Sequence, residues 1–278
     1  MTSQAGRWSR AELLVVFRLY CRTPFGRLHR RNPEIVALAQ RIGRTPDAVA
    51  MKACNFASLD PQLRERRISG LGNASRADRA LWEEFAADSA AVALAAESAF
   101  AELTGLEDET TVPELGPAGQ SAPRGRPTKP RERVSKPPPP VGPTEAEALV
   151  RVRRVQRFFR AAVLAAYGGR CALTNLAIPD LLNASHIIPW HADEKRRADP
   201  RNGICLNVLH DRAFDRGLIS FDDELRIIVS DRLREAEGEL CELHRDHLLG
   251  LAGKKLRLPD RFLPDAAAIA YHRRKVHG

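Results

Sequence analysis

A proline-rich segment in the middle of the chain most constrains how the chain can fold. Residues 106–144 of the 278 contain closely spaced prolines, including the run Pro137–Pro140, among few bulky apolar side chains. Such a segment cannot bury a core, and it favours an extended or polyproline-like linker. We therefore expect a helical domain at residues 1–105, the linker at 106–144 and a second domain at 145–278.

The N-terminal part carries the start signals of three short helices. Ser9 and Glu12 form a capping box ahead of an apolar run, and Asn32 and Thr45 are N-cap residues that each precede a proline. Three such helices within about fifty residues look like a helix-turn-helix or Myb-like module.

The turn at residues 43–49 is similar to the one that enters the recognition helix of such modules. This similarity makes Arg44, Lys52 and Asn55 candidate DNA contacts. A glycine followed by Thr-Pro also joins two helices of any bundle, so a purely structural role is equally open.

A further helix is expected from Ser75 to about Leu103, with Trp82 and Phe85 facing inward and many alanines after them. A long alanine-rich helix buries little area by itself and needs a partner. The first three helices or a second copy of the chain, in a homodimer, could provide that partner.

Residues 123–127 of the linker read Pro-Arg-Gly-Arg-Pro, the core of an AT-hook. In an AT-hook, Arg124 and Arg126 would enter the narrow minor groove of A·T-rich DNA, and the glycine would let the backbone approach the groove. A basic proline-rich linker also produces this pentamer by chance. In either case the linker adds salt-sensitive affinity for DNA.

Two motifs in the second domain carry the strongest functional signal. They are residues 184–190, ASHIIPW, and residues 202–217, NGICLNVLHDRAFDRG. Together they resemble the HNH endonuclease superfamily, in particular its bacterial restriction-endonuclease-like branch. The resemblance implies a ββα-metal fold, in which a strand carries His186, a second strand lies near 203–206 and a helix presents His210.

The same resemblance implies roles for single residues. His186 would be the general base that deprotonates a water, and Asn202 would orient the loop that holds it. His210 would bind a divalent metal ion, most readily Mg²⁺ or Mn²⁺, with Zn²⁺ or Ni²⁺ as alternatives.

Ser185 departs from the pattern, because many relatives carry Asp or His at this position as a metal ligand. The second ligand would then be Asp215, Asp211 or His191, and we choose Asp215 because it belongs to the H-x-x-F-D pattern. His191 follows a Pro-Trp pair and is expected in a loop.

Cysteines offer neither a zinc site nor a disulfide framework. Many HNH proteins brace the fold with two C-x-x-C pairs, but Cys171 and Cys205 have Thr174 and Val208 at the partner positions. We therefore interpret both as buried small apolar residues. Five widely spaced cysteines suit a reducing compartment.

The remaining patterns concern helices, charge and location. An arginine-rich helix is expected at 145–167, a hairpin around 222–224 and a closing helix at 265–276. A net charge of +9 favours a polyanionic partner such as double-stranded DNA, although a ribosomal or membrane-surface contact would give the same balance. We expect a cytoplasmic protein, because no secretory signal or membrane span is evident.

These patterns together predict an α+β protein that acts as a metal-dependent HNH DNA endonuclease, in restriction or phage defence. Two other functions stay open. The chain would be a non-catalytic DNA-binding or regulatory protein if the HNH fold serves only as a scaffold, which Ser185 favours. It would be a nonspecific nuclease toxin if residues 1–105 are not needed for cutting.

Overall fold

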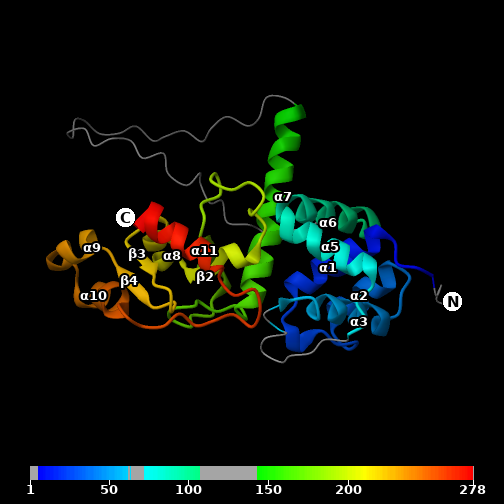
Figure 1. Cartoon of the computed structure of the whole chain (residues 1–278), viewed down its shortest axis with the longest axis horizontal. Coiled ribbons are helices and arrows are strands. Elements are labelled where there is room, and N and C mark those ends of the chain that lie inside the picture. Colours follow the sequence, from blue (N-terminus) through cyan, green and yellow to red (C-terminus); the bar gives the residue numbers. More distant parts are fainter. Residues whose placement is uncertain (1–5, 62, 64–71, 107–142, 278) are drawn as a thin grey trace.

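The computed structural model describes residues 6–61, 63, 72–106 and 143–277 (Figure 1). Most of the linker, including Arg124 and Arg126, therefore lies outside the described residues. Helices dominate, and two separate two-stranded antiparallel sheets accompany them, which confirms an α+β fold. No helix of the described part is long and apolar enough to cross a membrane.

The three short helices expected near the N-terminus are present with the expected caps. They are α1 (Arg10–Arg22), α2 (Pro33–Arg41) and α3 (Pro46–Ala57), with the 3-10 turn η1 (Phe25–Arg27) between the first two. Ser9 forms the capping box with Glu12, and the side chains of Asn32 and Thr45 accept hydrogen bonds from the first turns of α2 and α3.

The single helix expected from Ser75 to Leu103 is instead two helices. They are α5 (Arg76–Ala87) and α6 (Ser89–Thr104). Asp88 between them is extended, with φ −149°, and its carboxylate accepts a hydrogen bond from the amide of Ala91. Asp88 therefore ends one helix and caps the next. The turn lets α6 pack on α1 and α7 within the same chain.

Helix α7 (Pro143–Ala166) joins the two parts of the molecule. Figure 1 shows α7, in green, between the N-terminal helices and the C-terminal part, with its first turns extending beyond the body. Its later turns contact α1 and α6 on one side and both strands of the first sheet on the other. The ring of Phe85 on α5 lies 6.0 Å from that of Phe158 on α7. As a result the buried apolar side chains of both parts form one continuous cluster.

The C-terminal part contains two hairpins and a set of short helices. The strands are β1 (Leu182–His186), β2 (Gly203–Asn207), β3 (Ile219–Phe221) and β4 (Ile227–Val229). The helices are α8 (Val208–Asp215), α9 (Asp231–Glu235), α10 (Glu242–Leu248) and α11 (Ala266–His272). The shorter turns are η2 (Pro179–Leu181), η3 (Pro200–Asn202), η4 (Glu237–Glu239), η5 (Leu249–Leu251) and η6 (Arg273–His277).

Strands β1 and β2 pair so that His186 lies opposite Gly203, and α8 follows β2 directly. Asn207 caps α8 as expected, and Gly217 has the left-handed φ of 65° that ends it. The closing helix is shorter than predicted, because α11 ends at His272 and a π-helical turn follows.

A buried arginine provides a second contact between the two parts. Arg261, ahead of α11, donates a hydrogen bond to the carbonyl oxygen of Cys21 at 2.9 Å. Its guanidinium carbon lies 4.6 Å from the centre of the Tyr20 ring. The planar cation therefore both caps the end of α1 and packs on an aromatic ring.

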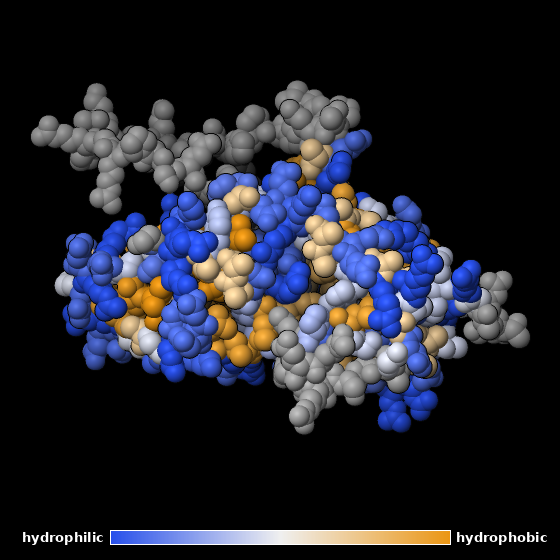
Figure 2. All heavy atoms as spheres, in the orientation of Figure 1, coloured by the Kyte–Doolittle hydropathy of each residue, from blue (hydrophilic) through white to orange (hydrophobic). Residues whose placement is uncertain are grey.

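The surface is mainly polar. On the face shown in Figure 2, hydrophilic residues cover most of the area and hydrophobic residues appear as smaller patches. Val208 and Leu209, at the start of α8, are 47% and 41% exposed, whereas Ala213 and Phe214 on the same helix are buried. Only the later apolar positions of α8 therefore face the core.

Gly203 is required for the close approach of β2 to α7. A Cβ atom at this position would lie 2.5 Å from Val163 Cγ2 and 2.7 Å from Phe159 Cζ. We expect Gly203→Ala to lower the free energy of unfolding by about 1–3 kcal/mol through overpacking, measured by urea denaturation. Gly238→Ala is the control, because a Cβ there meets nothing within 4 Å; equal effects of both substitutions would contradict the argument.

Candidate active site

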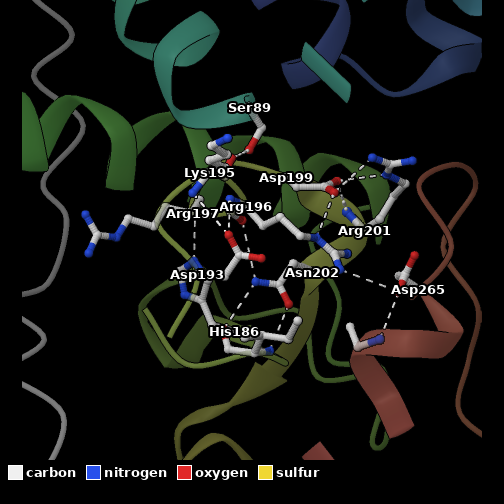
Figure 3. A network of polar contacts seen from close by, with 12 residues as sticks. Ser89, His186, Asp193, Lys195, Arg196, Arg197, Asp199, Arg201, Asn202 and Asp265 are labelled. Atoms are coloured by element: carbon white, nitrogen blue, oxygen red, sulfur yellow. Dashed lines mark hydrogen bonds and ion pairs between the residues drawn. The ribbon is translucent and has the colours of Figure 1, made fainter. Parts of the chain in front are cut away.

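His186, the last residue of β1, is held in one orientation. Its Nε2 lies 3.0 Å from the carbonyl oxygen of Arg197 (Figure 3). Its ring stacks on Phe159 with centroids 3.7 Å apart. The Trp190 ring packs nearly perpendicular to the His186 ring. Because a carbonyl only accepts, Nε2 carries the proton, and Nδ1 retains a lone pair that can accept one.

The surroundings of His186 also keep it neutral. Burial is the main cause that lowers the pKa of His186 to about 4, and the charge of Arg197 acts in the same direction. The hydrogen bond to the Arg197 carbonyl opposes this shift. At neutral pH the imidazole is therefore able to accept a proton from a water molecule.

Asn202 hydrogen-bonds to the backbone of the two residues that follow His186. Its Oδ1 accepts from the amide of Ile188 at 2.8 Å, and its Nδ2 donates to the carbonyl oxygen of the same residue at 3.2 Å. The amide of Ile187 donates to the Asn202 carbonyl oxygen at 2.9 Å. The buried amide thus makes the backbone hydrogen bonds that an orienting residue needs.

Ion pairs stabilise the loop between β1 and β2. Arg201 donates from Nε and Nη2 to the two carboxylate oxygens of Asp199, each at 3.0 Å. Arg196 lies 3.5 Å from Asp199 and 3.6 Å from Asp265, the N-cap of α11. Figure 3 shows this network beside His186.

Ser185 faces α8. Its hydroxyl donates to Oδ1 of Asp211, and Nδ2 of Asn183 donates to Oδ2 of the same carboxylate at 2.7 Å. Both Ser185 and Asp211 are buried. The position at which relatives carry a metal ligand therefore contacts a carboxylate from the neighbouring helix.

Asp215 lies one turn after Asp211 on α8. The pKa of Asp215 is raised to about 6, first because its carboxyl group is partly removed from water and then because the Asp211 charge is near. The two carboxylates therefore repel each other when both are charged.

His210 does not join this group of oxygen donors. It is fully buried, and its Nε2 donates to the carbonyl oxygen of His247 at 2.7 Å. Its Nδ1 makes no hydrogen bond of normal geometry within the described part of the chain. The buried Nδ1 therefore keeps an unused lone pair, and the role of His210 as a metal ligand stays a prediction.

The thiol of Cys171 has more polar contacts than a buried apolar residue would have. Burial acts to raise the pKa of the Cys171 thiol, but contacts from His210, Thr174 and backbone amides outweigh burial and lower the pKa to about 6. The amide of Asn207 also lies 3.3 Å from the sulfur. Cys171 is therefore a hydrogen-bond acceptor behind α8, which its spacing alone did not indicate.

The candidate DNA contacts of the N-terminal part are engaged in internal contacts. Lys52 Nζ lies 3.0 Å from both oxygens of the buried Asp78 carboxylate. Asn55 is also buried. Arg44 Nε donates to Glu12 at 2.7 Å, and its guanidinium lies over the Trp8 ring. Lys52 and Arg44 thus make contacts between helices and Asn55 is buried, which argues against the expectation that the three face DNA.

The residues around Ser185 form no defined metal site in the part of the chain that the structure describes. Among the described residues no three His, Cys, Asp or Glu side chains converge on one point. The available donors are instead oxygens, from Asp211, Asp215 and Ser185.

Comparison with known families agrees with this geometry. Residues 171–222 match a family model described as HNH endonuclease. This segment belongs to the HNH endonuclease superfamily. The HNH segment runs from Cys171 through β1, β2 and α8 to Asp222, just beyond β3, and includes His186, Asn202 and His210. No curated protein matches the chain. An HNH segment indicates a nuclease, and its substrate class is nucleic acid.

The partly buried His186 and the buried His272 make stability depend on pH. The pKa values of His186 and His272 are both lowered to about 4, chiefly by burial. An unfolded histidine titrates near 6.5, so the unfolded chain binds more protons between these two values. The stability that the two neutral histidines contribute is complete above pH 6.5, and it is lost as pH falls through about 4.

We expect the urea concentration at the unfolding midpoint to decrease as the pH is lowered from 7 to 4.5. The decrease should be smaller in His272→Gln. The exposed His191 provides the control, since His191→Gln removes a histidine without removing a buried one. Identical pH dependence of the wild type and His272→Gln would refute the assignment.

Proposed function

We propose that this protein is a metal-dependent DNA endonuclease that hydrolyses phosphodiester bonds in restriction or phage defence. The observation that supports it most is a neutral His186, held through Nε2 with Nδ1 available, inside an HNH-family segment. A base of this kind is what the attack of water on a phosphodiester requires.

In the proposed reaction, His186 Nδ1 takes a proton from a water molecule while the water oxygen attacks phosphorus. The bond from phosphorus to the leaving sugar oxygen breaks, and that oxygen takes up a proton from solvent. The Arg197 carbonyl holds the imidazole in the required tautomer, and Asn202 holds the chain behind it. A base positioned in this way contributes roughly 10²–10⁴ in rate.

Asp211 and Asp215, with the hydroxyl of Ser185, would hold the divalent ion. When bound, the ion stabilises negative charge on the phosphate and on the leaving oxygen. Oxygen donors favour Mg²⁺ or Mn²⁺, and Nδ1 of His210, which has no hydrogen-bond partner among the described residues, would add a nitrogen ligand that Zn²⁺ or Ni²⁺ also accepts.

The substrate would meet both groups at the end of β1. Successive side chains of a strand point to opposite faces, so His186 faces α7 while Ser185 faces α8. Because His186 is the last residue of β1, a phosphate at this end of the strand is able to contact both faces.

Double-stranded DNA is the proposed substrate. Exposed arginines on α7, Arg151 and Arg153, are available for phosphate contacts on the helix that also carries Phe159. A single site of this type cuts one strand, so cleavage of both strands would take a homodimer or two successive nicks.

One observation favours a second function, a DNA-binding or regulatory protein that keeps the HNH fold without cleavage. No three-ligand cluster exists among the residues that the structure describes, and both oxygens of Asp211 already accept hydrogen bonds. Such a protein would bind DNA and lose nothing on replacement of His186.

The decisive experiment compares His186→Ala with the wild type on supercoiled plasmid in Mg²⁺ or Mn²⁺. We expect the variant to nick roughly 10²–10⁴ times more slowly, and EDTA to stop the wild type. His191→Ala, which removes an exposed histidine five residues away, should cut normally. A wild type that binds plasmid but never cuts it would favour the scaffold function.

Arg124 and Arg126 are proposed to hold DNA through the minor groove. If they do, Arg124→Ala with Arg126→Ala should reduce the slope of log affinity against log salt by about two and remove any preference for A·T-rich duplexes. Arg131→Ala with Arg133→Ala is the matched control, because it removes the same charge from the same linker. Equal losses in both pairs, with no A·T preference, would indicate a generic basic tether.

A further inference from the structure

The start of α6 contacts the loop that holds His186. The Ser89 hydroxyl donates to the carbonyl oxygen of Lys195 at 2.8 Å, and the amide of Ala90 donates to the same oxygen at 3.2 Å (Figure 3). Ser89 is buried. Two donors from the N-terminal part thus fix one backbone carbonyl of the nuclease part.

This carbonyl lies two residues before the one that binds His186. Oδ1 of Asp193 accepts from the amides of Lys195 and Arg196 at 3.1 and 3.2 Å, which closes a tight turn. Arg197 completes the turn, since its Nε donates to the Trp190 carbonyl oxygen at 2.8 Å. A shift at Lys195 would therefore move Arg197 and, with it, the partner of His186.

The other end of the loop is anchored independently. The amide of Asp265 donates to the carbonyl oxygen of Arg201 at 2.9 Å, and Arg201 itself pairs with Asp199. With that end fixed by the C-terminal part, the contact at Lys195 sets the position of the middle of the loop.

We propose that Ser89 is a positioning residue for His186, so that α6 of the N-terminal part is needed for the chemical step as well as for any targeting. The inference rests on the proposed function of His186 as the base. It implies that whatever binds to or shifts the N-terminal helices changes the rate of cleavage through the Lys195 carbonyl.

The test uses the full chain with three substitutions. Ser89→Ala removes the hydroxyl donor, and Ser89→Thr restores it. Ser98→Ala is the matched control, because Ser98 lies on the same helix and accepts a hydrogen bond from Arg154 on α7 without touching the loop. Thermal unfolding of each variant verifies that the fold is retained.

Two measurements separate positioning from a general structural effect. The first is plasmid nicking, where we expect Ser89→Ala to lower kcat about fivefold with KM unchanged, and Ser89→Thr and Ser98→Ala to match the wild type. The second is NMR of ¹⁵N-histidine-labelled protein, assigned with His186→Ala. There Ser89→Ala should shift the ¹⁵N signals of the His186 ring nitrogens, because the hydrogen bond from Nε2 to the Arg197 carbonyl is disturbed, and the other two variants should not.

The outcomes distinguish the two proposals. If the wild type cuts DNA but Ser89→Ala leaves both kcat and the His186 signals unchanged, the positioning role is wrong and the nuclease function stands. Unchanged signals in Ser89→Ala overturn the positioning role even if the wild type does not cut. A wild type that does not cut, with signals that shift only in Ser89→Ala, would refute the base function while the link from α6 to His186 holds.

Discussion

The stack of Phe159 on His186, next to a glycine, is the contact on which the site depends. Phe159 can lie there only because Gly203, the register partner of His186, has no side chain. The ring fixes the orientation of the imidazole and removes it from water, which lowers its pKa. One helix and one glycine thus determine both the geometry and the protonation state of the candidate base.

The same helix makes the two parts of the chain one packed unit. α7 contacts α1 and α6 on one side and the first hairpin on the other, while Arg261 and Ser89 add polar contacts between the parts. A proline-rich linker predicts separation of the segments it joins, but it says nothing about whether they pack together afterwards. If cleavage depends on Ser89, the N-terminal helices contribute to activity directly.

The residues expected to read DNA illustrate how burial changes an interpretation. Lys52 is a basic residue on α3, the helix that resembles a recognition helix. Its partner Asp78 lies on α5, 26 residues later, and the pair is buried. The proposed DNA-binding surface therefore moves to the linker arginines and to the exposed arginines of α7.

Local signals in the sequence determined most of the secondary structure and the family. Caps such as Ser9 and Asn207, the glycine at 217 and the spacing from His186 to Asn202 act over a few residues or belong to one motif, so each could be predicted from neighbours. Only the tertiary structure decided which side chains meet. Ser185 contacts Asp211 across 26 positions and Ser89 contacts Lys195 across 106, and the burial of His210 depends on α10. Contacts between distant residues depend on packing of the whole chain, which no local pattern encodes.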